Sequence, residues 1–119
     1  SVTTTDLEGN IVSWNRGSEK TFGYSASETI GKNISMLYQK KDKAVMQEYI
    51  PELMRTGMYN ADLYLVKKSK ELIPISFSLS LLRNENGEPI GVVGINKDVT
   101  KRKQAENELF EQKSILHYQ

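Results

Sequence analysis

The segment IPISFSLSL, residues 73–81, constrains the fold more than any other part of the chain. Apolar residues stand at every second position, and serines alternate with them in its second half. A period of two is typical of a β-strand with one buried face. Burial of that face would contribute about 10 kcal/mol before conformational entropy is subtracted. The side chains that we expect on it are Ile73, Ile75, Phe77, Leu79 and Leu81.

Further β segments stand near both ends of the chain. VTTTDLEGNIVSWN predicts a hairpin, because Gly9 and Asn10 supply turn chemistry between two β-rich runs. MYNADLYLV alternates and puts Ala61, Leu63 and Leu65 on one face, and IGVVGINKDV follows the NENGEP turn as the last strand. Strands grouped at the two ends of the chain indicate an α+β domain, with helices on one face of an antiparallel sheet.

The middle of the chain is predicted to be helical. Apolar pairs recur about every four residues from 42 to 56, which gives one helix with an apolar stripe that ends at Gly57. Pro51 should kink or restart this helix. Upstream, Ser25 and Glu28 have the spacing of a capping box, which predicts one of several short helices there.

Composition excludes several kinds of chemistry. The chain has no cysteine, so it forms no disulfide, thiolate nucleophile or cysteine-bound zinc site. Its net charge is +1, which argues against nucleic acid as the main partner. Its apolar runs are too short for a membrane span, and we see no secretory leader. The composition fits a cytoplasmic location, and the abrupt ends suggest a piece of a longer protein.

Five segments together resemble the PAS family of sensory domains. They are DLEGNIVSWN at 6–15, FGYSASETIGK at 22–32, KELIPI at 70–75, NGEPIGVVGINKDVT at 86–100 and the helix that follows. The resemblance implies a five-stranded antiparallel sheet in the order 2-1-5-4-3, with short helices on one face. It also implies a domain over 1–100 and a linker helix over 101–119, which leads to an effector such as a histidine kinase.

Few residues of this chain match those that bind cofactors in other branches of the family. In the light-sensing branch, a cysteine that bonds to flavin stands where this chain has Ile34. In the haem-binding branch, a histidine on the long helix stands where this chain has Met46, and the only histidine, His117, lies near the chain end. No residue argues positively for either cofactor, non-covalent flavin binding stays an alternative, and we predict no metal site. One further departure is Ser69–Lys70 in place of an Asp-Gly turn, where lysine in a left-handed position costs more than glycine.

A ligand, if one binds, is expected between the 42–56 helix and the inner face of the sheet. The same apolar side chains would equally fill a plain core with no ligand. The candidate lining residues are Ile34, Leu37, Met46, Tyr49, Ile50, Leu63, Phe77, Leu79 and Ile95.

The end of the chain predicts a signalling junction and a pairing helix. Asp98, Val99 and Thr100 match the family's strand-to-helix junction, and Asp98 or Thr100 suits a helix cap. In the helix, a narrow heptad-like seam suits a second helix and hence a homodimer, while the alternative is a helix folded back on its own sheet. The seam residues are Ala105, Leu109, Gln112 and Leu116.

No residue pattern in the sequence indicates catalysis. A Ser/His/Asp set cannot form around His117 at the tail, and the scattered carboxylates lack paired spacing. We expect a non-catalytic sensor and relay module of a larger signal-transduction protein, such as a two-component histidine kinase. The alternative is a purely structural homodimerisation or protein-interaction domain with no ligand.

Overall fold

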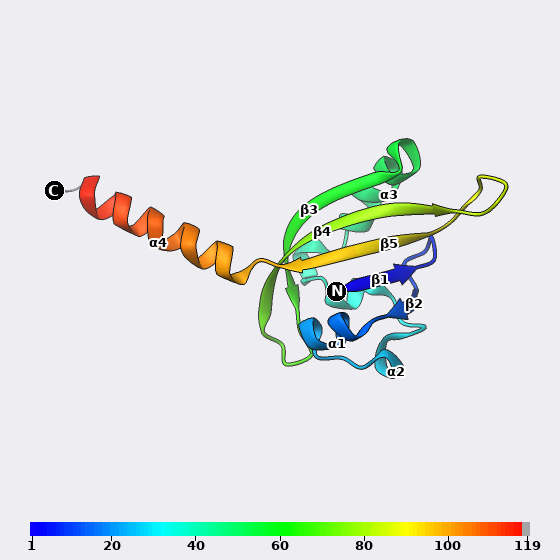
Figure 1. Cartoon of the computed structure of the whole chain (residues 1–119), viewed down its shortest axis with the longest axis horizontal. Coiled ribbons are helices and arrows are strands. Elements are labelled where there is room, and N and C mark those ends of the chain that lie inside the picture. Colours follow the sequence, from blue (N-terminus) through cyan, green and yellow to red (C-terminus); the bar gives the residue numbers. More distant parts are fainter. Residues whose placement is uncertain (118–119) are drawn as a thin grey trace.

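The fold is an antiparallel sheet with helices packed against it and one helix that leaves it (Figure 1). A computed structural model describes the backbone of residues 1–117 and the side chains of residues 1–112. The elements in chain order are β1 (Val2–Thr5), β2 (Ile11–Trp14), α1 (Arg16–Phe22), α2 (Ala26–Thr29), the 3-10 turns η1 (Ile34–Leu37) and η2 (Lys40–Asp42), α3 (Val45–Thr56), β3 (Met58–Val66), β4 (Leu72–Arg83), β5 (Pro89–Asp98) and α4 (Thr100–His117).

The five strands run in the order β2-β1-β5-β4-β3, and every neighbouring pair is antiparallel, as the resemblance implied. The last strand, β5, therefore lies at the centre of the sheet. Gly94 on β5 pairs with Thr3 on β1 and with Leu79 on β4. This register places a residue without a side chain at the middle of the inner face.

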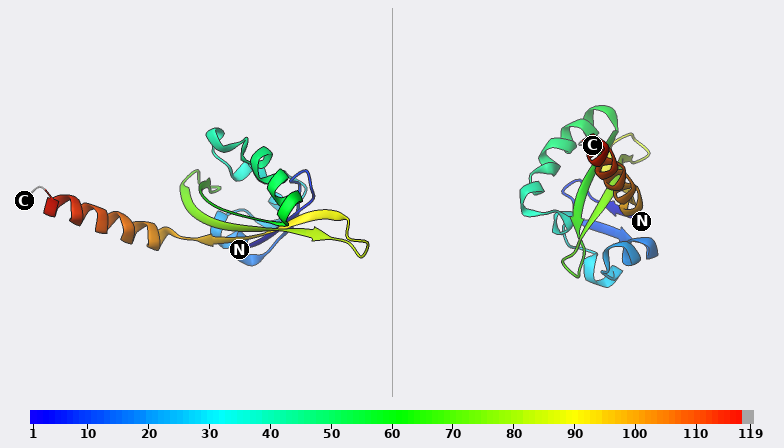
Figure 2. Two further views of the ribbon diagram at one scale, coloured as in Figure 1. Left: turned by 90° about the horizontal axis from the view of Figure 1, so that it is seen from above. Right: turned by 90° about the vertical axis from the view of Figure 1, so that its left-hand side faces the viewer.

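The buried face of β4 confirms the period-two pattern. Ile75 is fully buried and Phe77 is 3% exposed, while Ser78 and Ser80 on the other face are exposed. Figure 2 shows α3 lying across the inner face, and the core between them contains Tyr49 and Leu53 of α3. Burial of one face of β4 thus positions the helix that closes the interior.

Several local predictions are confirmed. The capping box at Ser25 and Glu28 has both of its hydrogen bonds, and α3 ends at Gly57, whose φ of 83° is left-handed.

Helix α3 differs from the prediction at its start. It begins at Val45 rather than at residue 42, because a separate 3-10 turn precedes it. It also continues through Pro51 without a restart.

Lys70 turns the chain between β3 and β4 with a φ of 78°. Among the residues that the structure describes, it is the one non-glycine residue with a positive φ. The lysine therefore adopts the left-handed conformation that the substitution of Asp-Gly by Ser-Lys implied.

Helix α4 projects away from the sheet (Figure 1). Every described side chain from Gln104 to Gln112 is exposed, so the alternative in which this helix folds back on its own sheet is wrong for this structure. None of the helices in the described part of the chain is both long and apolar enough to cross a membrane.

Candidate functional site

A small cavity lies between the inner face of the sheet and the segments that cover it. Its volume is about 30 Å³, and its walls come from β1, β3, β4, β5, η1 and α3. The residues that line it are Thr3, Thr5, Ile34, Leu37, Tyr38, Tyr49, Leu65, Phe77, Leu79, Val92, Gly94 and Asn96.

The structure brings together most of the predicted lining residues. Five of the nine line the cavity, and three more are half-buried and pack against the surrounding core without lining it. The five are Ile34, Leu37, Tyr49, Phe77 and Leu79. The three are Met46, Ile50 and Leu63.

Ile95 does not belong to the cavity, and its assignment there is wrong. Its side chain is 58% exposed, whereas its neighbours Gly94 and Asn96 line the cavity. Side chains alternate between the two faces of a strand, so Ile95 points to the open face. It sits there beside Val2 of β1, which is 40% exposed.

Sequence reasoning missed seven of the residues that line the cavity, which are Thr3, Thr5, Tyr38, Leu65, Val92, Gly94 and Asn96. Thr3 and Thr5 of β1 stand two apart, and this spacing puts both on one face of a strand. The spacing is a usable signal, but threonine is more often exposed than buried. Gly94 and Asn96 carry no comparable signal, because only the pairing of β5 with both neighbours shows which face they occupy.

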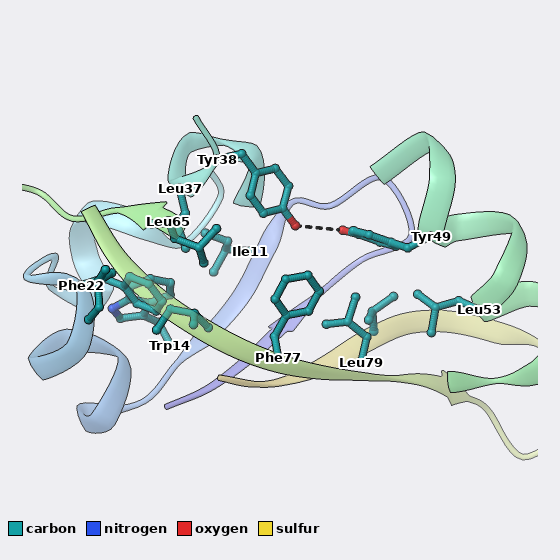
Figure 3. Close-up of a cluster of buried hydrophobic side chains, with 13 residues drawn as sticks. Ile11, Trp14, Phe22, Leu37, Tyr38, Tyr49, Leu53, Leu65, Phe77 and Leu79 are labelled. Atoms are coloured by element: carbon teal, nitrogen blue, oxygen red, sulfur yellow. Dashed lines mark hydrogen bonds between the residues drawn. The ribbon is translucent and has the colours of Figure 1, made fainter. Parts of the chain in front are cut away.

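Two tyrosine hydroxyls meet at the cavity wall. Tyr38, which follows η1, and Tyr49 of α3 are 7% and 4% exposed, and their hydroxyl oxygens are 3.4 Å apart in a hydrogen bond. Figure 3 shows the pair above Phe77 and Leu79. Burial raises the pKa of Tyr38, and burial likewise raises the pKa of Tyr49. Both hydroxyls therefore stay neutral and protonated at physiological pH.

The sheet supplies a second polar surface opposite the tyrosines. The Asn96 side-chain amide donates to the Thr3 hydroxyl over 3.4 Å and to the Ser1 hydroxyl over 3.2 Å. The Thr5 hydroxyl donates to the carbonyl of Asp6 over 2.9 Å. The cavity is therefore an apolar space with hydroxyl groups on two of its walls.

The cavity in this form is much smaller than a site for a large cofactor, since ligand pockets typically measure about 300–1,000 Å³. Ile34, at the position of the flavin-bonding cysteine, does line it. Met46, at the position of the haem histidine, instead packs on the β1–β2 turn, where a β-carbon added at Gly9 would collide with the Met46 methyl group. Ile34 has no thiol with which to form a flavin adduct.

The junction between β5 and α4 is ordered by several contacts. Val99 is 4% exposed, and its N–H donates to the carbonyl of Pro74 on β4 over 3.0 Å. The Asp98 carboxylate accepts from the N–H of Thr100 over 2.9 Å and also from the Thr100 hydroxyl. The Lys103 N–H donates to the carbonyl of Val99 over 2.9 Å, which begins the helix. The sheet and α4 are thus joined without a glycine or a loop.

Three of the four predicted seam residues are left uncovered by the described part of the chain. Ala105 and Gln112 are exposed, and Leu109 is 53% exposed. Leu116 falls within the backbone range of α4, but its side chain lies outside the described residues. The adjacent Phe110, which the seam did not include, is 71% exposed.

A five-stranded antiparallel sheet in this order, covered by helices and extended by a helix from its last strand, defines one class of α+β domain. The chain matches the PAS domain family over residues 1–101, and it belongs to that family.

Two curated relatives come from signal-transduction systems. The chain is 27% identical over 103 residues to two-component system protein A of Emericella nidulans, and 26% identical over 105 residues to the signal transduction histidine-protein kinase AtoS of Escherichia coli. These matches cover 85% and 87% of the chain. The matched region spans only 15% and 17% of the relatives, so the chain corresponds to one part of each.

Solved structures show the same fold. The PAS domain of a Colwellia psychrerythraea protein has 32% sequence identity and a TM-score of 0.80, covering 84% of this chain and 86% of that one. An RNA-binding light-oxygen-voltage receptor has 23% identity and a TM-score of 0.79, covering 98% of this chain and 34% of that one. The likeness to the receptor supports the fold alone.

Proposed function

We propose that this chain is the sensor and relay module of a larger signal-transduction protein, such as a histidine kinase. It contributes no catalysis of its own, and it signals through α4 to an effector domain of the same protein. Membership of the PAS family and the two relatives from two-component and kinase systems support this proposal.

The observation that carries the proposal is the continuity of β5 with α4. Val92, Gly94 and Asn96 of β5 form a wall of the cavity, and the same strand enters α4 through Val99. A ligand or partner that favours one arrangement of β5 would therefore favour one orientation of α4. A shift in population from 1:99 to 99:1 needs about 5.5 kcal/mol of differential binding, which a few buried contacts supply.

The exposed seam of α4 supports homodimerisation as the route of output. Leu109 stands four residues after Ala105 and three before Gln112, a spacing that brings all three to one side of a helix. A second copy of the chain would cover this side by pairing its own α4. Rotation of the paired helices would then carry the signal to the effector.

The test is an insertion series in the full-length protein. One to four residues are inserted after Thr100, because each added helical residue rotates the seam by about 100°. We expect output to depend on the number inserted and to return when seven residues are inserted, since about two turns restore the register. Equal output from every insertion would refute the relay.

The control is the same insertion series at Asn86, in the exposed turn between β4 and β5. These insertions lengthen a loop at the end of the sheet away from α4 (Figure 1), so they leave output unchanged. Output that varied equally at both places would show a general effect on folding rather than rotation of the seam.

The small size of the cavity favours a second candidate function. A module with a packed interior would serve as a structural dimerisation or protein-interaction domain and would respond to no small molecule. Native mass spectrometry together with an absorption spectrum separates the two. A mass equal to two bare chains without any retained molecule supports the structural function, and a retained molecule supports the sensor.

A further inference from the structure

The Tyr38–Tyr49 pair has one more donor than this structure uses. Each hydroxyl carries one proton, and the single hydrogen bond between them consumes one of the two. Among the described residues, no acceptor receives the second proton. Both side chains are more than nine-tenths buried, so a group within the cavity must accept this proton if its full desolvation cost is to be avoided.

The sheet presents a second hydroxyl to the same space. Thr3 is 4% exposed and accepts from Asn96, while no described residue accepts its own proton. Gly94 lets this hydroxyl approach β5 closely, because a β-carbon there would lie only 2.9 Å from the Thr3 hydroxyl oxygen. The cavity therefore has unused donors on its helical wall and on its floor.

The cavity is small, and its described lining carries no charge. None of the described residues that line it is ionised at neutral pH. A carboxylate or phosphate would enter without a cation to compensate its lost hydration, which is costly in an apolar space. A volume of about 30 Å³ admits two or three water molecules by the usual measure, so a compact molecule of about four heavy atoms needs only small side-chain shifts.

We propose that this cavity binds a small neutral molecule with an apolar body and one oxygen that accepts hydrogen bonds, such as a short ketone. The oxygen accepts the free proton of the tyrosine pair, and the apolar body packs on Phe77, Leu79 and Val92. This inference rests on the sensor function proposed above and names the chemical class of its ligand.

The first test compares acetone with acetate, which have the same number of heavy atoms and differ in charge. Each is titrated into the isotopically labelled chain while backbone amide resonances are recorded. We expect acetone to give saturable shifts at Tyr38, Tyr49 and Gly94, and acetate at neutral pH to give none over the same concentrations. Equal binding of acetate, or no saturable binding of acetone, would overturn the proposal.

The second test measures how acetone binding depends on the hydroxyl donors of Tyr38 and Tyr49. Tyr38→Phe or Tyr49→Phe alone removes one proton and also the bond that consumed the other, so each single variant still presents one donor. We expect each single variant to bind acetone within about threefold of the original chain, and the double variant to bind about tenfold more weakly. Unchanged affinity in the double variant would contradict the proposal.

Controls separate this proposal from folding and from the relay. Tyr64→Phe, an exposed tyrosine outside the cavity, should leave acetone binding unchanged. If the double variant does not fold, the comparison of acetone with acetate on the original chain still decides. A failed acetone titration combined with output that follows the insertion series would overturn the ligand class and leave the relay intact.

Discussion

Arg102 in the first turn of α4 and Asp62 on the edge strand β3 form an ion pair across 2.9 Å. Both side chains are 49% exposed, so the pair contributes little to global stability. Its importance is geometric, because it holds the first turn of α4 against β3 while buried Val99 holds it against β4. Two contacts on different strands fix the direction in which α4 leaves the sheet.

Removal of this ion pair should loosen the helix start more than it destabilises the domain. For Asp62→Asn, we expect the free energy of unfolding to fall by less than about 1 kcal/mol. We also expect hydrogen exchange at the Lys103 amide, which donates to Val99, to become several times faster. Glu52→Gln breaks the exposed pair with Arg55 and is the matched control. Equal exchange at Lys103 in both variants would contradict this role.

Protonation of Glu28, which pairs with Lys68, should lower the stability of the folded domain in acid. The hydrogen bond from Lys68, followed by the N–H of Ser25, lowers the pKa of Glu28 to about 2 from its usual 4.5. The folded state therefore favours the ionised form, and its stabilisation is complete above pH 4.5 and is lost as the pH falls through about 2.

Thermal unfolding at a series of pH values tests this. Glu28→Gln should remove part of the decline in melting temperature between pH 4.5 and 2. Lys68→Met should reduce the same decline, because it removes the main cause of the lowered pKa. A decline of equal steepness in both variants and in the original chain would show that this pair does not control the acid response.

Lys70→Gly should stabilise the domain. The left-handed backbone of Lys70 costs about 1–2 kcal/mol, and the greater freedom of an unfolded glycine offsets part of the relief, so we expect a net gain of about 0.5 kcal/mol. Ser69→Gly is the control, because its backbone has no positive φ to relieve and it should therefore destabilise the domain. Chemical denaturation measures both changes, and a loss of stability in Lys70→Gly would refute the claim of strain.

Leu109→Glu should weaken the proposed dimer without unfolding the domain. The side chain is 53% exposed in the single chain, so a charge there costs little in the monomer, while it would be desolvated in a paired seam. Sedimentation at several concentrations should show a dimer for the original chain and a monomer for the variant. Glu108→Gln, another change on α4 outside the seam, should leave the dimer intact. An unchanged dimer in Leu109→Glu would place the interface elsewhere.

The sequence predicted those parts of the fold that depend on local patterns. The alternation of apolar residues and serines in β4 indicated which face is buried, and the spacing of Ser25 and Glu28 indicated a helix start. The order of the strands came from the resemblance, since period-two patterns alone do not say which strands pair.

The candidate site was predicted less completely, for a physical reason. The segment IGVVGI carries apolar residues on both faces, because β5 is central and its outer face is also apolar. The sequence pattern therefore did not separate Val92, which is buried, from Ile95, which is exposed. Tyr38 and Thr3 line one cavity through strand pairing and the placement of η1 over the sheet, which short-range patterns do not encode.

The most direct test of the central claim measures whether β5 and α4 form one rigid piece. Backbone order parameters from nitrogen-15 relaxation should be recorded for every amide from Asn96 to Glu106. We predict values of about 0.85 without interruption through Val99 and Thr100, the level of a rigid backbone. Values below about 0.6 at these two residues would show a flexible hinge and would contradict transmission of a cavity event to the helix.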